Sequence, residues 1–160
     1  MVRPKGFEQD LFVVTTLSSL TAPSAAQINA GVNIKSDLPA PVNFSGTQNY
    51  IDTSTVASQQ DLQETGTVGI DNLAFEIRRH KTGAQLAYDA LPNGAVRYLV
   101  KFEGGGMATP GTAAAGDICD VAQVTVGIKT DVPGPRNDDR RVNVPVALSA
   151  AIAWRSTVVA

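Results

Sequence analysis

The sequence contains few of the side chains that build disulfides, metal sites or large aromatic cores. Its 160 residues include one cysteine, Cys119, and one histidine, His80, which excludes an intramolecular disulfide and a multi-histidine metal site. Aromatic residues make up only 6% of the chain and charged residues 18%, whereas Ala, Thr, Ser, Val and Gly are abundant. This composition is too apolar for a disordered chain but provides few large core residues. We therefore expect a folded domain that gains stability from neighbouring molecules.

The sequence also lacks an excess of positive charge and a long apolar run. Thirteen Lys and Arg against fifteen Asp and Glu give a net charge of -2, which argues against a basic nucleic-acid-binding protein or a protein attracted to anionic membranes. No apolar run approaches the roughly 18 residues that span a bilayer. Residues 1–10 carry charges with no apolar segment behind them, so we expect neither a secretion signal nor a membrane anchor. The length fits a single domain over residues 1–160.

The clearest pattern that is present is the alternation over residues 142–154. Its even positions are apolar, so we expect Leu148 and Trp154 in the core, where substitution by Ala would cost on the order of 2 to 5 kcal/mol. A solvent-facing strand usually carries Lys, Glu or Thr, but the odd positions here are small or uncharged, namely Asn143, Pro145, Ala147, Ser149, Ala151 and Ala153. We expect this odd face to pack against another sheet or subunit. Pro145 cannot donate a ladder hydrogen bond, which indicates a sheet edge or a bulge.

Other alternating segments predict four further strands, at residues 11–16, 73–78, 96–103 and 117–129. In the last of these segments Val121 breaks the alternation, which indicates a β-bulge. Residues 130–141 combine a Val-Pro-Gly-Pro run with a cluster of charges, so we expect an exposed charged hairpin loop. The C-terminal third of the chain is thereby predicted to form a long hairpin.

Helical patterns are scarce. A short helix is expected over residues 82–91, capped by Thr82 and ended by Pro92, and a second short turn over residues 23–31. Because strand-like segments outnumber helical ones, the predicted fold class is mainly β, a β-sandwich or barrel with one short flanking α-helix.

Residues 43–69 differ from the rest of the chain, being rich in Ser, Thr, Gln, Asn and acidic residues. Parts of this stretch fit a strand pattern, but it is too polar to lie wholly inside a core. A segment of this length within a compact domain is usually functional or becomes ordered against a partner. Its scattered apolar residues would provide the contacts, and they are Phe44, Tyr50, Ile51 and Leu62.

No group of residues has the pattern of a catalytic or cofactor site. The triple glycine at 104–106 is not followed by the Gly-Lys-Ser/Thr of a phosphate loop, and it fits a flexible strand exit better. The basic run 78–81 would suit phosphate or an acidic protein, although an exposed strand end is the more common setting. Cys119 has no second histidine or asparagine pattern beside it, so a buried, unreactive thiol is expected. We therefore predict no enzyme, no cofactor and no metal.

Several segments, taken in order along the chain, resemble the major tail tube proteins of long, non-contractile-tailed (siphovirus-type) bacteriophages, especially those of actinobacterial hosts. The resemblance covers most of the chain. The segments that carry it are residues 25–34 after a Leu-Thr-Ala-Pro start, 46–52, 88–94 leading into 97–100, and the strands that hold 119–121 and 144–146.

This resemblance implies a β-sandwich with a flanking helix, hexameric rings, and stacking of the rings into a hollow tube that carries DNA. It also implies a virion protein assembled in the host bacterial cytoplasm, with the tape-measure protein, the tail terminator and distal tail proteins as partners. Ring contacts would then involve the odd face of 142–154 together with Arg140 and Arg141. An acidic or neutral wall lets DNA slide, whereas a basic wall would hold its phosphates. The candidate lumen-facing acids are Asp52, Asp61, Glu64 and Asp71.

The alternative is a monomeric β-sandwich binding module. It would present the stretch 43–69 and the loop 130–141 to a protein or carbohydrate ligand. Rings or tubes of the purified protein would separate the two hypotheses, because only the first predicts them.

Overall fold

The computed structural model describes residues 9–44, 47–52, 63–69, 73–80, 82–104, 106–135 and 140–160. The strands are β1 (Gln9–Val14), β2 (Val32–Asn33), β3 (Thr47–Asp52), β4 (Gln63–Gly69), β5 (Leu73–Arg78), β6 (Val96–Glu103), β7 (Ile118–Val126), β8 (Thr130–Val132), β9 (Arg141–Leu148) and β10 (Ala153–Thr157). The helical elements are α1 (Ala25–Asn29), the single 3₁₀ turn η1 (Lys35–Asp37) and α2 (Leu86–Ala90). The fold is mainly β, as predicted, with two short α-helices in place of the one expected.

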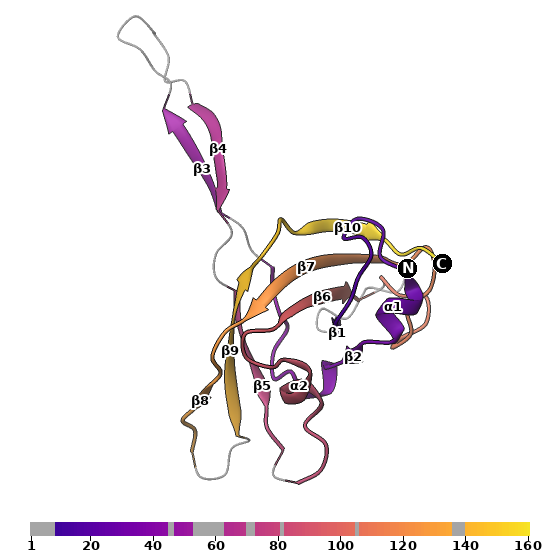
Figure 1. Ribbon diagram of the computed structural model, residues 1–160, viewed down its shortest axis with the longest axis vertical. Helices are drawn as coiled ribbons and strands as arrows, with labels where there is room; N and C mark the ends of the chain where they lie inside the picture. Colours follow the sequence, from indigo (N-terminus) through magenta and orange to yellow (C-terminus); the bar gives the residue numbers. More distant parts are fainter. Residues whose placement is uncertain are drawn as a thin grey trace, which may run out of the picture.

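Eight of the strands form one antiparallel sheet with the order β2-β1-β6-β7-β9-β5. The short strands β10 and β8 join this sheet beside β7 and β9, respectively. Strands β3 and β4 pair with each other as a separate hairpin that projects from the body of the molecule (Figure 1). The predicted C-terminal hairpin is present, because β9 pairs antiparallel with both β7 and β8.

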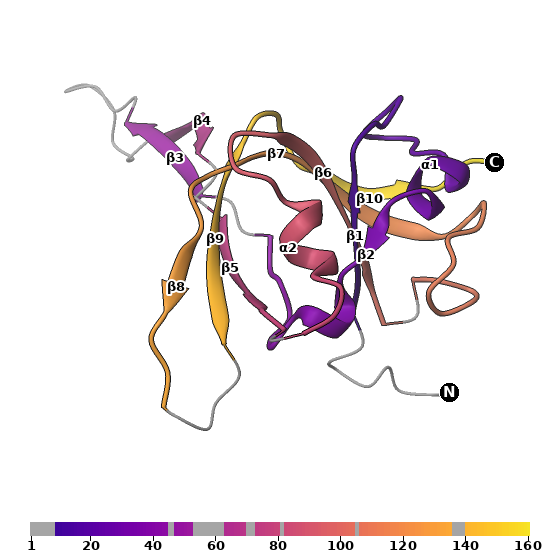
Figure 2. The same cartoon turned by 60° about the horizontal axis from the view of Figure 1, so that its bottom comes forward.

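The sheet curls around helix α2, which lies between β5 and β9 on one side and β1 and β2 on the other (Figure 2). Ala87 and Leu91 of this region are fully buried together with the inward residues of β1, β5, β6, β7 and β9. The opposite face of β1, β6 and β7 packs against Ile28 of α1 and against Val158 near the C-terminus. The central strands therefore separate two hydrophobic cores and are buried on both faces.

Burial on both faces explains why Val121 breaks the alternation in β7. Cys119 and Val121 belong to the core beneath α1, whereas Ala122, Val124 and Val126 belong to the core around α2. The pairing of β6 with β7 keeps one register from Val96↔Thr125 to Lys101↔Asp120. The predicted bulge in β7 is thus wrong. The irregularity lies in the partner strand β10, where the register shifts between Ala153 and Ser156.

Residues 142–154 form two strands and not the single strand that the alternation predicts. Val142, Val144 and Val146 are buried as expected, but β9 ends at Leu148, which is only half-buried. Strand β10 then starts with a shifted register, so Ser156 is buried and Trp154 is 54% exposed. The prediction that Trp154 lies in the core is wrong, because the period-2 pattern does not continue across the connection and the bulge.

Pro145 lies in β9, opposite a shift in the neighbouring strands. The register changes by one residue between Val126↔Val146 and Thr130↔Asn143, so β7 has ended and β8 has not begun beside the proline. The carbonyl of Pro145 accepts a hydrogen bond from the N–H of Gly127 at 2.7 Å. The missing N–H of proline is tolerated here because it would point toward β7 and β8, where Pro145 has no ladder partner, and not toward its partner Ala74 in β5.

Helix α2 is shorter than predicted and begins at Leu86, so Thr82 does not cap it. The carboxylate of Asp37, buried on η1, accepts the N–H of Ala87 at 3.1 Å in the first turn of α2. The other oxygen of Asp37 lies 2.7 Å from Nε2 of His80, which follows β5 closely in the chain. A side chain that is distant in sequence therefore accepts a hydrogen bond from a backbone N–H in the first turn of the helix, and local sequence patterns do not reveal this cap.

Candidate assembly surfaces

One face of β5 and β9 carries small or polar side chains. Because Val142, Val144 and Val146 point into the core, the odd residues of β9 lie on the outer face, where Asn143 and Pro145 are half-buried and Ala147 is exposed. In the register of the sheet, exposed Ala74 of β5 stands beside Pro145. Exposed Ser149 and Ala151 belong to the connection that follows β9. This surface, which we call the small-residue face, is open to close approach by another chain.

Strand β5 is the last strand of the sheet order and pairs only with β9 among the strands that the structure describes. Its inward residues Leu73, Phe75 and Ile77 are buried, so the strand is held firmly on the body. An edge strand with unpaired backbone groups is a template for pairing with another chain. The small-residue face and the β5 edge are adjacent and form one continuous candidate contact surface.

The hairpin of β3 and β4, together with the residues between them in sequence, is called the arm and spans residues 47–69. Its register runs from Thr47↔Gly69 to Asp52↔Gln63, with a shift between Gln48 and Tyr50. Of the residues expected to contact a neighbour or the lumen, Tyr50, Ile51 and Asp52 lie on β3 and Glu64 lies on β4. Three others lie outside the described residues, namely Asp61, Leu62 and Asp71.

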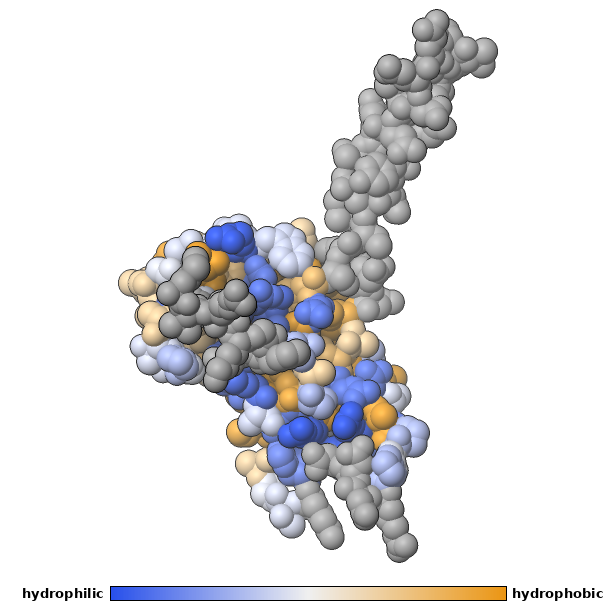
Figure 3. All heavy atoms as spheres, turned by 180° about the vertical axis from the view of Figure 1, so that it is seen from behind, coloured by the Kyte–Doolittle hydropathy of each residue, from blue (hydrophilic) through white to orange (hydrophobic). Residues whose placement is uncertain are grey.

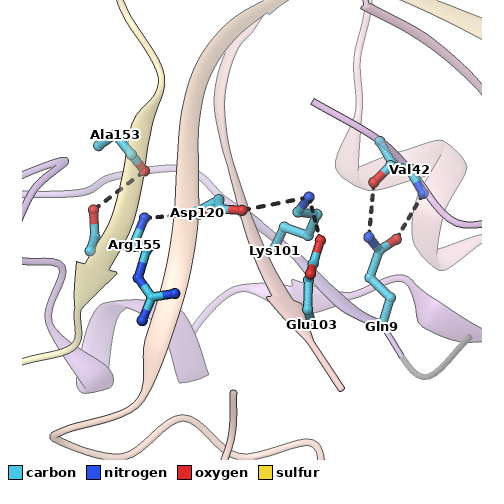
Figure 4. A network of polar contacts seen from close by, with 8 residues as sticks. Gln9, Val42, Lys101, Glu103, Asp120, Ala153 and Arg155 are labelled. Carbon is cyan, nitrogen blue, oxygen red and sulfur yellow. Dashed lines mark hydrogen bonds and ion pairs between the residues drawn. The ribbon is translucent and has the colours of Figure 1, made fainter. Parts of the chain in front are cut away.

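The chain that leads into the arm is fixed to the body by two sets of contacts. The side-chain amide of Gln9 forms two hydrogen bonds with the backbone N–H and carbonyl of Val42, both at 2.8 Å (Figure 4). Phe44 is 8% exposed, and the centre of its ring lies 4.9 Å from the ammonium of Lys101 and 6.5 Å from the centre of the Trp154 ring. Phe44 therefore belongs to the core of its own subunit.

Lys101 of β6 is a buried charge. Its ammonium, 4% exposed, lies 3.0 Å from Glu103 and 3.5 Å from Asp120 (Figure 4). Asp120 also accepts the backbone N–H of Arg155 at 2.9 Å. Arg155 has a φ of 50°, so this hydrogen bond helps to hold β10 in its bulge. Because both faces of β6 are buried, alternation alone gave no means of predicting this cluster.

Cys119 lies beside this cluster and is not suited to nucleophilic chemistry. Burial, followed by the charges of Asp120 and Asp117, raises the pKa of the Cys119 thiol to about 12. The thiol is therefore protonated and weakly reactive near neutral pH. Among the residues that the structure describes, no three His, Cys, Asp or Glu side chains lie together as a potential metal site. The described helices include none long and apolar enough to cross a membrane.

The end of the β5–β9 ladder gathers four arginines, Arg78, Arg79, Arg140 and Arg141, which we call the arginine end. Arg78 and Arg141 are direct partners in the register, and the N–H of Arg79 donates to the carbonyl of Arg140 at 2.8 Å. Arg141 pairs with Glu76 at 3.6 Å, and Arg79 lies 3.9 Å from Asp131. Seen from behind, strongly hydrophilic residues lie near the lower end of the coloured body, and others lie near its top (Figure 3).

The chain was compared with known proteins. The family model described as phage tail tube protein matches residues 8–160. No curated protein sequence matches the chain. A solved structure described as "Crystal structure of Hcp protein" is similar over 88% of this chain and 88% of that chain, with 10% sequence identity and a TM-score of 0.38. The family match, which leaves out only the first seven residues, shows that the chain belongs to the phage tail tube protein family.

Proposed function

We propose that this protein forms hexameric rings that stack into the hollow tail tube of a long, non-contractile-tailed phage, through which DNA passes during ejection. The match to the phage tail tube family over residues 8–160 carries this proposal. The protein is then a structural component of the virion, assembled in the host cytoplasm. It acts by self-assembly and not by catalysis, and it needs no cofactor.

The continuous surface formed by the small-residue face and the β5 edge is the proposed contact within a ring. Side chains such as Ala74, Ala147 and Ser149 allow the backbone of a neighbour to approach closely. Pairing of the β5 edge with a strand of the next subunit would satisfy its backbone groups and remove an aggregation-prone edge. A cyclic arrangement of this kind uses two different patches on each subunit, and it closes if the rotation between subunits divides the circle.

The proposed lumen is acidic or neutral, with Asp52, Asp61, Glu64 and Asp71 as candidate contributors. Each DNA phosphate that a basic wall neutralised would release counterions and so strengthen the binding of DNA to the wall in a salt-dependent way. Every ring of the tube would repeat this attraction. A wall without clustered Lys or Arg avoids this retention. The proposed partners besides the protein itself are the tape-measure protein inside the tube, the tail terminator at one end and distal tail proteins at the other.

Negative-stain microscopy and light scattering on the purified full chain test the ring and tube proposal. Rings or tubes are expected, whereas a stable monomer under all conditions would contradict the proposal and favour a binding module. Ala147→Arg places a long charged side chain on the small-residue face and is expected to prevent ring formation while the subunit stays folded. Ala147→Ser is the matched control, because it keeps the residue small, and it should assemble normally.

A further inference from the structure

The ion cluster around Lys101 brings a buried amine beside a carboxyl group of the neighbouring strand. The ammonium is 4% exposed and lies 3.0 Å from Glu103 of β6 and 3.5 Å from Asp120 of β7 (Figure 4). Lys101 and Asp120 are direct partners in the antiparallel register of these two strands. Replacing a buried ion pair by well-packed apolar side chains often leaves stability unchanged or raises it. Stability alone therefore does not account for this pair, and its chemistry is considered next.

The amine lies in position to attack the carboxyl carbon of Asp120. That carbon is bonded to Oδ2, which lies 3.5 Å from Nζ of Lys101. A small rotation of the lysine side chain brings Nζ to the roughly 3 to 3.5 Å at which reacting atoms stand in near-attack conformers. The reaction requires a neutral amine and a neutral acid, and burial lowers the cost of this state relative to the charged pair. The ring of Phe44, 4.9 Å from Nζ, contributes to this burial.

The backbone of β10 supplies a hydrogen-bond donor to the other oxygen of the same carboxyl group. The N–H of Arg155 donates to Oδ1 of Asp120 at 2.9 Å (Figure 4). When an amine attacks a carboxyl carbon, negative charge develops on the oxygen that stays, and a fixed N–H donor stabilises that charge. Arg155 has a φ of 50°, a left-handed conformation that side chains rarely adopt. Strained backbone of this kind is concentrated at functional sites.

We propose that Lys101 and Asp120 condense to an amide bond that joins β6 to β7. Glu103, 3.0 Å from Nζ, accepts a proton from the ammonium, and Oδ2 of Asp120 takes up one proton. Nζ then attacks Cγ of Asp120, the bond from Cγ to Oδ2 breaks, and Oδ2 leaves as water with a second proton that comes from Nζ. One water molecule is released for each amide, and no oxidant, reductant or other co-reactant is needed.

Proximity makes this condensation favourable in spite of the surrounding water. Two groups held in a well-oriented pair behave as if each were present at about 10⁵ to 10⁸ M, far above the concentration of liquid water. A pocket of about 230 Å³, lined by Lys101, Glu103 and Asp120 among other residues, lies beside the pair. This pocket gives the released water a path away from the new bond.

The amide would give the body of the subunit a covalent cross-link that resists reducing agents. It closes the chain over residues 102–119 and restricts the unfolded state in the way that a disulfide does. The chain has one cysteine, Cys119, so it forms no disulfide within itself. This inference does not depend on the proposed tube, because both reacting groups belong to one subunit.

Mass spectrometry of the denatured full chain tests the bond without any variant. The bonded chain is lighter by one water molecule. Trypsin should leave residues 98–129 as a single peptide, because Lys101 is the one cleavage site within it and no longer has a free amine. Separate peptides 98–101 and 102–129 would overturn the proposal. A loss of water from a chain that trypsin still cuts after Lys101 would indicate a cyclic imide and would overturn it as well.

A second ion pair in the same molecule is the internal control. Lys35 lies 3.6 Å from Asp10, a distance similar to that between Lys101 and Asp120, but the side chain of Lys35 is 45% exposed. Water keeps this pair charged, so no amide is expected there and trypsin should cut after Lys35. An amide at both pairs would show that the buried setting of Lys101 is not what permits the reaction, and the argument from burial would be wrong.

Glu103→Gln separates the chemistry from folding. The side chain of Glu103 is 72% exposed, so the variant is expected to fold, which circular dichroism would check. The rate at which the amide appears after cell-free synthesis should fall about 100-fold, because the group that accepts the proton is lost. Lys101→Arg keeps the positive charge without the amine and should abolish the bond. An unchanged rate in Glu103→Gln would contradict the proton transfer proposed for Glu103, and a persisting loss of water in Lys101→Arg would contradict the bond itself.

Discussion

At the scale of single residues, the least predictable feature of this protein is the buried ammonium of Lys101. It stands between buried Val100 and buried Phe102 on a strand covered on both faces, so the sequence gives no sign that this lysine is inside. The ring of Phe44 and the carboxylate of Asp120, which both lie close to the ammonium of Lys101, account for the buried position of this lysine. Lys101 thus connects the central strands to Phe44, in the chain that leads into the arm.

Replacing Lys101 should destabilise the subunit. Lys101→Met keeps the length of the side chain but leaves the partly buried carboxylate of Asp120 without its cation, and removal of one partner of a buried pair costs about 3 kcal/mol. Lys35→Met is the control, because Lys35 is 45% exposed and pairs with Asp10 at 3.6 Å, so its loss should change stability by less than about 1 kcal/mol. Urea unfolding of both variants measures the difference, and equal stabilities would contradict the role of Lys101.

Cys119 should make the stability of the subunit fall at high pH. Burial raises the pKa of its thiol from 9.0 to about 12, so the unfolded thiol loses its proton at a lower pH than the folded one. The folded state is therefore favoured fully below about pH 9 and loses this advantage as the pH rises toward about 12. Cys119→Ala should flatten the decrease of the melting temperature between about pH 9 and 11. An unchanged slope in that variant would show that other groups cause the decrease.

At the scale of elements, alternation predicted strands correctly where one face is solvent-exposed or small. Strand β5 follows this rule, with Leu73, Phe75 and Ile77 inside and Ala74 outside. The rule failed for β7 and for 142–154, because β7 changes from one core to the other at Val121 and because the chain breaks after Leu148. The sequence predicted the outer face of odd-numbered small residues in β9 and up to Ser149. The basic run 78–81 indicated part of the arginine end. The arm as a paired hairpin was not, since its polar sequence has little alternation.

The break after Leu148 changes what is expected of Trp154. Because Trp154 is 54% exposed, Trp154→Ala removes little buried area and should cost about 1 kcal/mol, mainly through its contact with the ring of Phe44. Leu99→Ala, in the fully buried middle of β6, should instead cost about 2 to 5 kcal/mol because a cavity remains. Chemical unfolding of both variants compares them directly. A larger loss for Trp154→Ala than for Leu99→Ala would mean that the tryptophan is buried in solution.

At the scale of the whole molecule, the fold combines a body that contains two hydrophobic cores with a separate two-stranded hairpin. The body has two cores on either side of the central strands, and the chain leading into the arm is held by Gln9 and by the packing of Phe44. Strands β3 and β4 pair with each other and with no other strand that the structure describes. A short two-stranded hairpin is only marginally stable by itself in water, so the pairing of β3 with β4 contributes little to the stability of an isolated subunit.

Removing the arm should therefore separate folding from assembly. In a variant whose residues 47–69 are replaced by a short Gly-Ser linker, the body is expected to keep its melting temperature within a few degrees, because both cores and the contacts of Gln9 and Phe44 remain. We expect the same variant to form rings but few tubes, because the small-residue face and the β5 edge proposed for the ring contact are intact, whereas the projecting hairpin is absent. Differential scanning calorimetry and electron microscopy measure the two properties on one sample. Tubes of normal length from the armless protein would show that stacking depends on another surface, whereas a large loss of thermal stability would show that the arm is part of the folding unit.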